Sequence, residues 1–112
     1  MISAARFHAL AGAFEGAVKV PHMERTAWRT KARIFATVAP DERSANLKLE
    51  GDSQEFWCEE RPDAFRPVPG GWGRMGMTTV DFDKVDDVDM VAALTHAYEL
   101  ARPKPKVRAK RR

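Results

Sequence analysis

The chain has 112 residues, 44% of them hydrophobic and 31% charged, a composition typical of one globular domain that buries its own core. A single cysteine, Cys58, excludes an intramolecular disulfide framework and a multi-cysteine zinc site. No apolar run reaches the roughly 20 residues of a membrane helix. Arg6, His8 and Glu15 interrupt the apolar start, where a signal peptide would be continuous. We therefore expect a soluble, cytoplasmic protein.

The net charge of +3 is unevenly distributed along the chain. Residues 103–112, PKPKVRAKRR, hold six of the nineteen basic side chains and no acid. Residues 1–102 therefore keep thirteen basic and sixteen acidic residues, a net charge of −3. This contrast predicts a folded domain over residues 1–102 and a basic, disordered tail over residues 103–112. The tail is either a solubilising end or a segment that attracts nucleic acid.

Charge is also uneven within the predicted domain. Residues 19–48 hold seven basic side chains against three acidic ones, whereas DFDKVDDVD, residues 81–89, holds five aspartates and one lysine. This pattern predicts a polarised surface, with a basic strand region and an acidic entry to the last helix.

Hydrophobic spacing predicts a helix at the start of the chain. Ser3 is placed to cap it, and Phe7, Leu10 and Phe14 share one face. Gly12 lies where a left-handed C-terminal cap is expected. The β-branched segment that follows is broken by Pro21, which predicts a short edge strand.

The next two segments have strand character. TAWRTKARIFATVAP, residues 26–40, predicts two strands joined by a tight turn at residues 30–32. SANLKLE, residues 44–50, alternates apolar and polar side chains as a half-buried antiparallel strand does, with Leu47 and Leu49 in the core.

The second half of the chain predicts a helix, a strand and a final helix. The second helix begins at Asp52 or Ser53 and ends before Pro62, and MTTVDF, residues 77–82, predicts a strand. Asp86 caps the last helix. Its predicted apolar stripe is Val91, Leu94, Tyr98 and Ala101. The order of elements favours a two-layer α+β fold, an antiparallel sheet with helices on one face.

A glycine-rich loop before the last strand surrounds Trp72. Its glycines are Gly70, Gly71, Gly73 and Gly76. We favour a structural turn in which Trp72 folds over the sheet as a plug. An exposed wing that offers Trp72 and Arg74 to a base or a phosphate is the second interpretation. A phosphate cradle is disfavoured, because the glycines lead into a strand rather than a helix and no Walker motif follows.

The remaining chemically interesting residues do not form a catalytic pattern. His8, His22 and His96 lack metal-ligand spacing, and the acids around Cys58 are expected to raise the pKa of its thiol. No catalytic, metal or cofactor site is predicted, so we do not expect an enzyme.

Several segments together resemble the MmcQ/YjbR family of small bacterial proteins. They are KARIFATVAPDERSANLKLE, WGRMGMTTVDF and VDDVDMVAALTHAYELARPK, and the resemblance runs over residues 3–104. It implies an α+β fold related to secretion chaperones and to CyaY, and DNA binding through a double-wing arrangement of strands and turns. In this chain Met77 stands where many relatives have a tryptophan, and TKAR, residues 30–33, lacks the glycine usual in that hairpin.

From these observations we predict a monomeric, non-enzymatic protein that binds DNA weakly and in a salt-dependent manner. The candidate nucleic-acid-binding residues are Arg29, Lys31, Arg33, Lys48, Trp72, Arg74, Lys104, Lys106, Arg108, Lys110, Arg111 and Arg112. The basic residues of the domain are either solvated charges on a half-buried sheet or phosphate contacts. The alternative function is a protein- or small-ligand-interaction module that uses the sheet face and the Trp72 loop. A continuous basic face would favour nucleic acid, and an apolar cleft beside Trp72 would favour the alternative.

Overall fold

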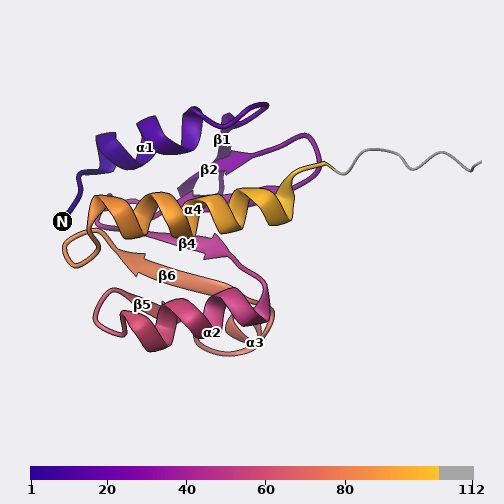
Figure 1. The fold of residues 1–112 in the computed structure, drawn as a ribbon. Coiled ribbons are helices and arrows are strands. Elements are labelled where there is room, and N and C mark those ends of the chain that lie inside the picture. Colours follow the sequence, from indigo (N-terminus) through magenta and orange to yellow (C-terminus); the bar gives the residue numbers. More distant parts are fainter. Residues whose placement is uncertain (104–112) are drawn as a thin grey trace, which may run out of the picture.

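The computed structural model describes residues 1–103 as a two-layer α+β fold. Its elements in chain order are α1 (Ala4–Gly12), β1 (Val18–His22), β2 (Arg25–Arg29), β3 (Ile34–Val38), β4 (Ser44–Lys48), α2 (Gly51–Glu60), β5 (Phe65–Pro67), α3 (Gly71–Arg74), β6 (Met77–Asp81) and α4 (Asp87–Ala101). The strands form one antiparallel sheet in the order β1-β2-β3-β4-β6-β5. Helices α1, α4 and α2 lie side by side over one face (Figure 1). The predicted fold class is confirmed.

None of the helices within residues 1–103 is both long and apolar enough to cross a membrane.

The alternation predicted for β4 separates the two faces of the sheet. Ala45 and Leu47 are buried toward the helices, whereas Asn46 and Lys48 lie on the opposite face and are partly exposed. Strand β6 alternates in the same way, because the antiparallel register sets Val80 beside Ala45. The core therefore occupies the space between the sheet and the helices, and one face of the sheet stays open.

A β-bulge explains why β3 shows no clean alternation in the sequence. Trp28 pairs with Ala36, but the next residue, Arg29, pairs with Ile34, so Phe35 is an extra residue in the ladder. Both Phe35 and Ala36 are fully buried, and the Phe35 ring packs edge-on against Tyr98 of α4 at 5.7 Å between centroids. The bulge turns two consecutive side chains toward the core.

The last helix packs on the sheet with a broader face than the sequence predicts. The buried residues of α4 are Met90, Ala93, Leu94, Ala97, Tyr98 and Ala101. The Asp86 side chain accepts a hydrogen bond from the Asp89 backbone N–H, which confirms the predicted cap. Val91 was wrongly assigned to the apolar stripe, because it is 39% exposed. Three small alanines let the helix axis approach the sheet closely, a role that a search for large apolar side chains misses.

Two details of the first helices differ from the sequence predictions. Ser3 caps α1 as predicted, but the left-handed residue after it is Gly16, with φ of 79°, rather than Gly12. A Cβ atom at Gly12 would lie 3.0 Å from the Trp28 ring, so close packing requires glycine there. Helix α2 begins at Gly51, one or two residues before the predicted start at Asp52 or Ser53, and no side chain caps it.

Two tryptophan–histidine hydrogen bonds tie elements together, one between the sheet and α1 and one between α2 and α4. Trp28 Nε1 on β2 donates to His8 Nδ1 on α1 at 2.9 Å. Trp57 Nε1 on α2 donates to His96 Nδ1 on α4 at 3.0 Å. A ring nitrogen that accepts a hydrogen bond carries no proton, so the bond from Trp28 requires a neutral imidazole at His8. Burial, and then the nearby charge of Lys19, lower the pKa of His8 from its ordinary value.

This arrangement predicts that acid weakens the fold through His8. Because the pKa of His8 is lower in the folded than in the unfolded chain, its contribution is complete above about pH 6.5 and is lost as the pH falls through the folded value. Glutamine at this position keeps an acceptor for Trp28 but does not titrate. Urea unfolding at about pH 7.5 and about pH 5.5 should show a smaller loss of stability for His8→Gln than for the unsubstituted protein. Equal losses would contradict the assigned role of His8.

Candidate functional site

The open face of the sheet is crossed by one continuous row of neighbouring residues. The row is Val20, Ala27, Thr37, Asn46, Thr79 and Arg66, one residue from each strand. Hydrogen bonds between side chains order its centre. The Thr79 hydroxyl donates to Asn46 Oδ1 at 2.8 Å, and Arg25 Nε donates to Thr37 Oγ1 at 2.8 Å. Arg25 Nη2 also donates to the Thr37 carbonyl at 3.2 Å, so two bonds fix its guanidinium against the sheet.

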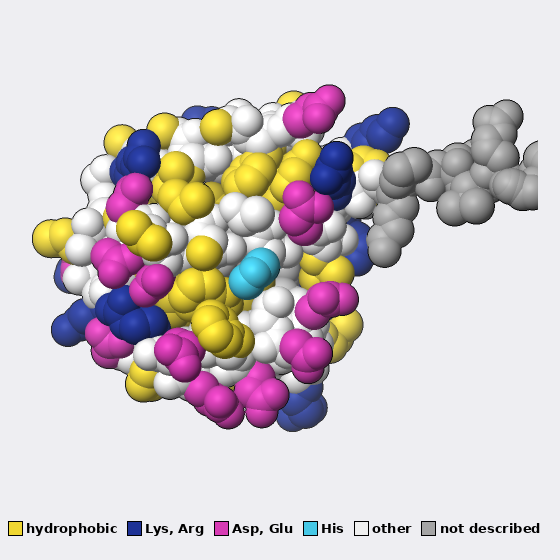
Figure 2. Space-filling model, viewed as in Figure 1, with side chains coloured by type: hydrophobic (Ala, Val, Ile, Leu, Met, Phe, Trp, Pro, Cys, Tyr) yellow, Lys and Arg dark blue, Asp and Glu magenta, His cyan; other side chains and the backbone are white. Residues whose placement is uncertain are grey.

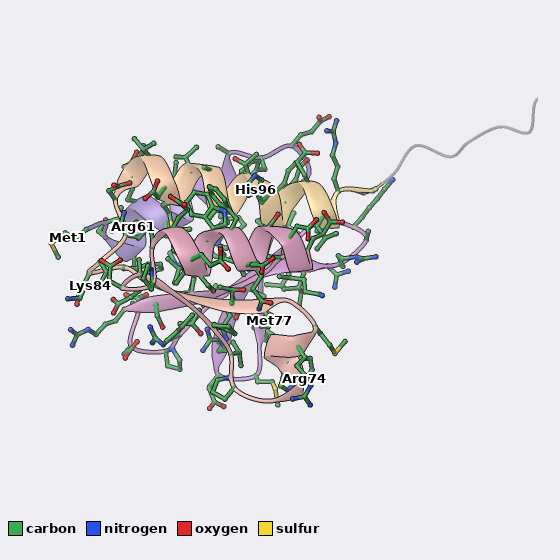
Figure 3. All side chains as sticks on the ribbon, turned by 60° about the horizontal axis from the view of Figure 1, so that its bottom comes forward. Met1, Arg61, Arg74, Met77, Lys84 and His96 are labelled. Atoms are coloured by element: carbon green, nitrogen blue, oxygen red, sulfur yellow. The ribbon has the colours of Figure 1, made fainter. Side chains whose placement is uncertain are left out.

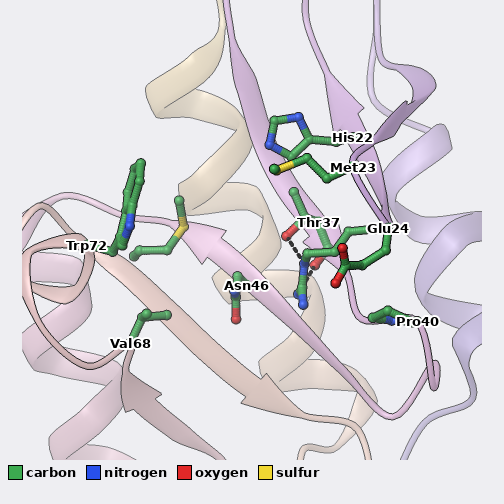
Figure 4. A pocket seen from close by; sticks show the side chains of 10 residues that line it. His22, Met23, Glu24, Thr37, Pro40, Asn46, Val68 and Trp72 are labelled. Atoms are coloured by element: carbon green, nitrogen blue, oxygen red, sulfur yellow. Dashed lines mark hydrogen bonds between the residues drawn. The ribbon is translucent and has the colours of Figure 1, made fainter.

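A hollow of about 430 Å³ runs diagonally across this face. We call it the sheet-face groove. Its lining residues are His22, Met23, Glu24, Arg25, Thr37, Pro40, Asn46, Val68, Trp72 and Met77. Figure 4 shows Trp72 and Val68 at one side, His22 and Met23 at the other, and Asn46 between them. Apolar side chains thus form both ends, and polar groups lie in the middle. This is a cleft of the kind expected of a ligand or partner site beside Trp72.

The interpretation of Trp72 as a plug is wrong. Its side chain is 65% exposed, and the loop is packed by its backbone instead. A Cβ atom at Gly73 would lie 1.9 Å from the Val68 carbonyl oxygen, and one at Gly76 would lie 1.9 Å from the Leu49 carbonyl oxygen. Backbone fills the space beneath the loop, so the indole stays outside. The exposed wing is the remaining interpretation of this loop.

The glycines also lead into a short helix, which the sequence analysis missed together with β5. Helix α3 spans only Gly71–Arg74, and Gly70 before it has φ of 81°. Four residues are too few to build the aligned dipole that a phosphate-binding helix needs. The Lys48 ammonium donates to the Met75 carbonyl at the C-terminal end of α3. That contact caps the helix, so Lys48 has a structural role that the prediction of a phosphate contact did not include.

The predicted basic residues of the domain gather at one end of the sheet. We call Arg29, Lys31, Arg33, Lys48 and Arg74 the basic end. Lys31 and Arg33 are exposed in the turn between β2 and β3. Lys48 pairs with Met77, directly after α3, and Figure 3 shows Arg74 close to that strand and far from His96 on the helix layer.

Helix α4 ends beside the same turn. Thr30 Oγ1 donates to the Ala101 carbonyl at 2.8 Å, and residue 103 is the last that the structure describes. The predicted tail residues Lys104, Lys106, Arg108, Lys110, Arg111 and Arg112 lie outside the described residues.

Charge is divided between the two layers of the fold. The six strands carry five basic side chains and one acid: Lys19, Arg25, Arg29, Lys48 and Arg66 against Asp81. Helices α1, α2 and α4 carry seven acids and one base: Asp52, Glu55, Glu59, Glu60, Asp87, Asp89 and Glu99 against Arg6. Figure 2, viewed from the side of the helices, shows many acidic side chains on that face. The sequence predicted a polarised surface, and the strands and the long helices do differ in the sign of their charge, while eight of the sixteen acids of residues 1–102 lie in the connecting loops.

Other titratable groups of the described chain have structural explanations. Burial, rather than neighbouring acids, raises the pKa of the Cys58 thiol, which corrects the predicted cause. Arg61 donates to Asp89 at 2.6 Å and ties the end of α2 to the start of α4. Within residues 1–103, no three His, Cys, Asp or Glu side chains are grouped as metal ligands would be.

The comparisons with known proteins agree with this fold. The chain belongs to the YjbR family, whose model matches residues 12–100. Its structure is similar to the crystal structure of Deinococcus radiodurans protein DR2400, which contains a DUF419 domain. The TM-score is 0.78 at 18% sequence identity, over 97% of this chain and 85% of that one. Identity this low supports the shared fold alone. No curated protein sequence matches the chain significantly.

The exposure of Trp72 can be measured by fluorescence quenching. Trp28 and Trp57 are 8% and 5% exposed, so an ionic quencher in water should reach mainly Trp72. We expect Trp72→Phe to remove most of the quenchable emission and to change the free energy of unfolding by less than about 0.5 kcal/mol. A large loss of stability, or unchanged quenching, would support the interpretation that the Trp72 side chain is packed over the sheet.

The glycines of the loop offer a matched pair of substitutions. Gly73→Ala brings a methyl group against the Val68 backbone, which cannot rotate away, and should cost at least about 1–3 kcal/mol. Gly71→Ala in the same helix meets only the far end of Arg74 at 3.6 Å and should be neutral or slightly stabilising. Urea unfolding of both variants measures the difference. Equal effects would show that the close approach at Gly73 is not what the loop requires.

Proposed function

We propose that this protein binds nucleic acid through the open face of its sheet, as a monomer and without catalysing a reaction. The observation that carries the proposal is the position of Trp72. Its indole is 65% exposed at one side of the sheet-face groove, in the loop that also contributes Arg74 to the basic end. An exposed aromatic ring next to clustered cations is the combination that stacks a base and neutralises its phosphate.

The charge distribution supports an oriented approach of a polyanion. The net charge of residues 1–102 is −3, so an averaged domain would repel phosphates. However, the strands carry an excess of four basic side chains, whereas the long helices carry an excess of six acids. The basic end therefore attracts a phosphate backbone, and the acids of the helix layer repel the same backbone from the helix side of the domain.

The tail adds a further electrostatic contribution. Its six basic side chains follow α4, which ends beside the turn that contains Lys31 and Arg33. Contacts of this type give affinity with little sequence preference, and each phosphate neutralised on a duplex adds about 0.9 to the salt slope of log affinity.

A second candidate function has its own supporting observation. Met23 is 90% exposed and Met77 and Val68 line the same groove, so its ends are apolar and adaptable. Methionine-rich surfaces accommodate protein segments and small apolar ligands of varied shape. The alternative is an interaction module in which the groove receives a partner and the basic end plays no part.

A charge-matched pair of variants separates these candidates. We expect the triple variant Arg29→Ala, Lys31→Ala, Arg33→Ala to bind a labelled nucleic acid more weakly and with a smaller salt slope, because it removes up to three phosphate contacts. The control removes three basic residues elsewhere, Arg6, Arg43 and Lys84, and changes the net charge equally. Titrations at low and moderate salt, followed by anisotropy, measure both.

Truncation to residues 1–102 completes the design. Retention of weaker binding that the triple variant reduces further would support the domain surface as the binding site. Equal weakening by the control triple would show that net charge alone matters. Failure of the full chain to bind any nucleic acid at low salt would contradict the proposal and favour the interaction module.

A further inference from the structure

We infer that the sheet-face groove holds the unpaired bases of single-stranded nucleic acid, with one base stacked on Trp72. This inference rests on the proposed function and specifies the form of nucleic acid that the site takes. The proposed occupant of the groove is a single strand. The shape, the charge and the hydrogen-bonding groups of the open face support this assignment.

The shape of the face is unsuited to a duplex. Proteins read duplex bases by inserting a helix or a two-stranded ribbon into the major groove. The centre of this face is instead a hollow of about 430 Å³ in a sheet surface. A hollow accepts objects that project from the ligand, and the bases of a single strand can project in this way. In a duplex they are stacked inside and only the phosphates project.

The dimensions fit a short run of bases. The groove crosses from Trp72 of α3 and Met77 at the start of β6 to Arg25 at the start of β2. Three strand spacings separate β6 from β2 in the sheet order, about 14 Å in all. RNA-binding sheets of four strands stack two or three bases over a similar width. Trp72 can receive the base at one end.

Polar groups in the middle of the groove favour base edges over phosphates. Thr79 donates to Asn46 Oδ1, which leaves the amide N–H groups of Asn46 for a ligand. Arg25 uses Nε and Nη2 on Thr37, which leaves Nη1. These donors match the carbonyl oxygens of thymine, uracil or guanine. Glu24 is the one acid among the ten lining residues, and it disfavours a phosphate at the far end. Phosphates are left to the basic end.

The arrangement therefore assigns different parts of one strand to different residues. The bases enter an apolar groove with donors at its centre, and the backbone passes the basic end. Neither part requires base pairing, and a complementary strand would cover the edges that Asn46 and Arg25 are placed to meet.

The inference is tested with the full chain and three probes of about twelve nucleotides, a length within the site sizes of single-strand binders. The probes are oligo(dT), oligo(U) and a mixed-sequence DNA duplex. Binding is followed by anisotropy at one moderate salt concentration and by quenching of Trp72 emission. We expect at least one single strand to bind about ten-fold more tightly than the duplex and to quench Trp72. Preference for oligo(dT) or for oligo(U) shows whether the site favours a DNA or an RNA strand, through the sugar, the thymine methyl group or both.

The variants test the groove rather than the general charge. Trp72→Ala should weaken single-strand binding between about 5-fold and about 150-fold, the loss of one stacked base, and should leave duplex binding nearly unchanged. The matched control is Phe56→Ala, an aromatic residue that is 50% exposed on α2 in the helix layer. Asn46→Asp, nearly isosteric, places a negative charge in the groove and should also reduce the preference for single strands.

The outcomes separate this inference from the proposed function. Equal or tighter binding of the duplex, with Trp72 unquenched, would overturn the single-strand assignment while the proposed function stands. Absence of binding to all three probes would overturn both. Loss of single-strand binding in Phe56→Ala equal to that in Trp72→Ala would also overturn the assignment, because the effect would not belong to the groove.

Discussion

The packing of α4 against the sheet fixes the position of nearly every other element. Tyr98 contacts the bulged Phe35 and donates its hydroxyl to the Glu15 carbonyl after α1 at 2.6 Å. The Thr30 hydroxyl binds the carbonyl at the end of α4, and His96 accepts the bond from Trp57 of α2. Buried polar groups are costly unless paired, so each of these bonds specifies one arrangement. Within residues 1–103, the long helices are thereby held on one side, and none of them covers the opposite face of the sheet (Figure 1).

The open face can remain in contact with water because many of its side chains are polar. Along β4 the half-exposed residues are Ser44, Asn46 and Lys48, and their cross-strand neighbours on β6 include Thr79 and Asp81. A polar row of this kind needs no second layer for stability. The apolar residues that line the groove are Met23 and Pro40 in turns, Val68 and Trp72 around the glycine-rich loop, and Met77 at the start of β6. Core formation does not account for these apolar residues, since they bury nothing against the helices.

Local patterns in the sequence predicted the parts of the fold that depend on local physics. The strand alternation around Leu47, the cap by Asp86 and the α+β order follow from side-chain period and backbone capping, which act within a few residues. The bulge at Phe35 and the exposure of Trp72 depend on partners far along the chain. Gly73 and Gly76 are required by two carbonyl groups that approach only in the folded state. Glycine in a sequence signals freedom of the backbone and does not reveal which contact uses it.

The electrostatic character of the site also could not be predicted from local sequence patterns. It depends on whether each charged residue lies in the sheet or in the helix layer. The net charge of −3 for residues 1–102 argues against binding of a polyanion only if the distance of each charge from the ligand is ignored. The helix layer is about 10 Å across, and salt screens exposed charges over about 8 Å under physiological conditions. A phosphate on the open face therefore responds mainly to the strand residues of that face, which are Arg25, Arg29, Lys48, Arg66 and Asp81, and to Glu24 in the groove. At low ionic strength the screening length grows past the thickness of the domain and the acids of the helices begin to oppose binding. The layered fold, rather than the total charge, therefore sets the local potential that a polyanion would meet at the open face.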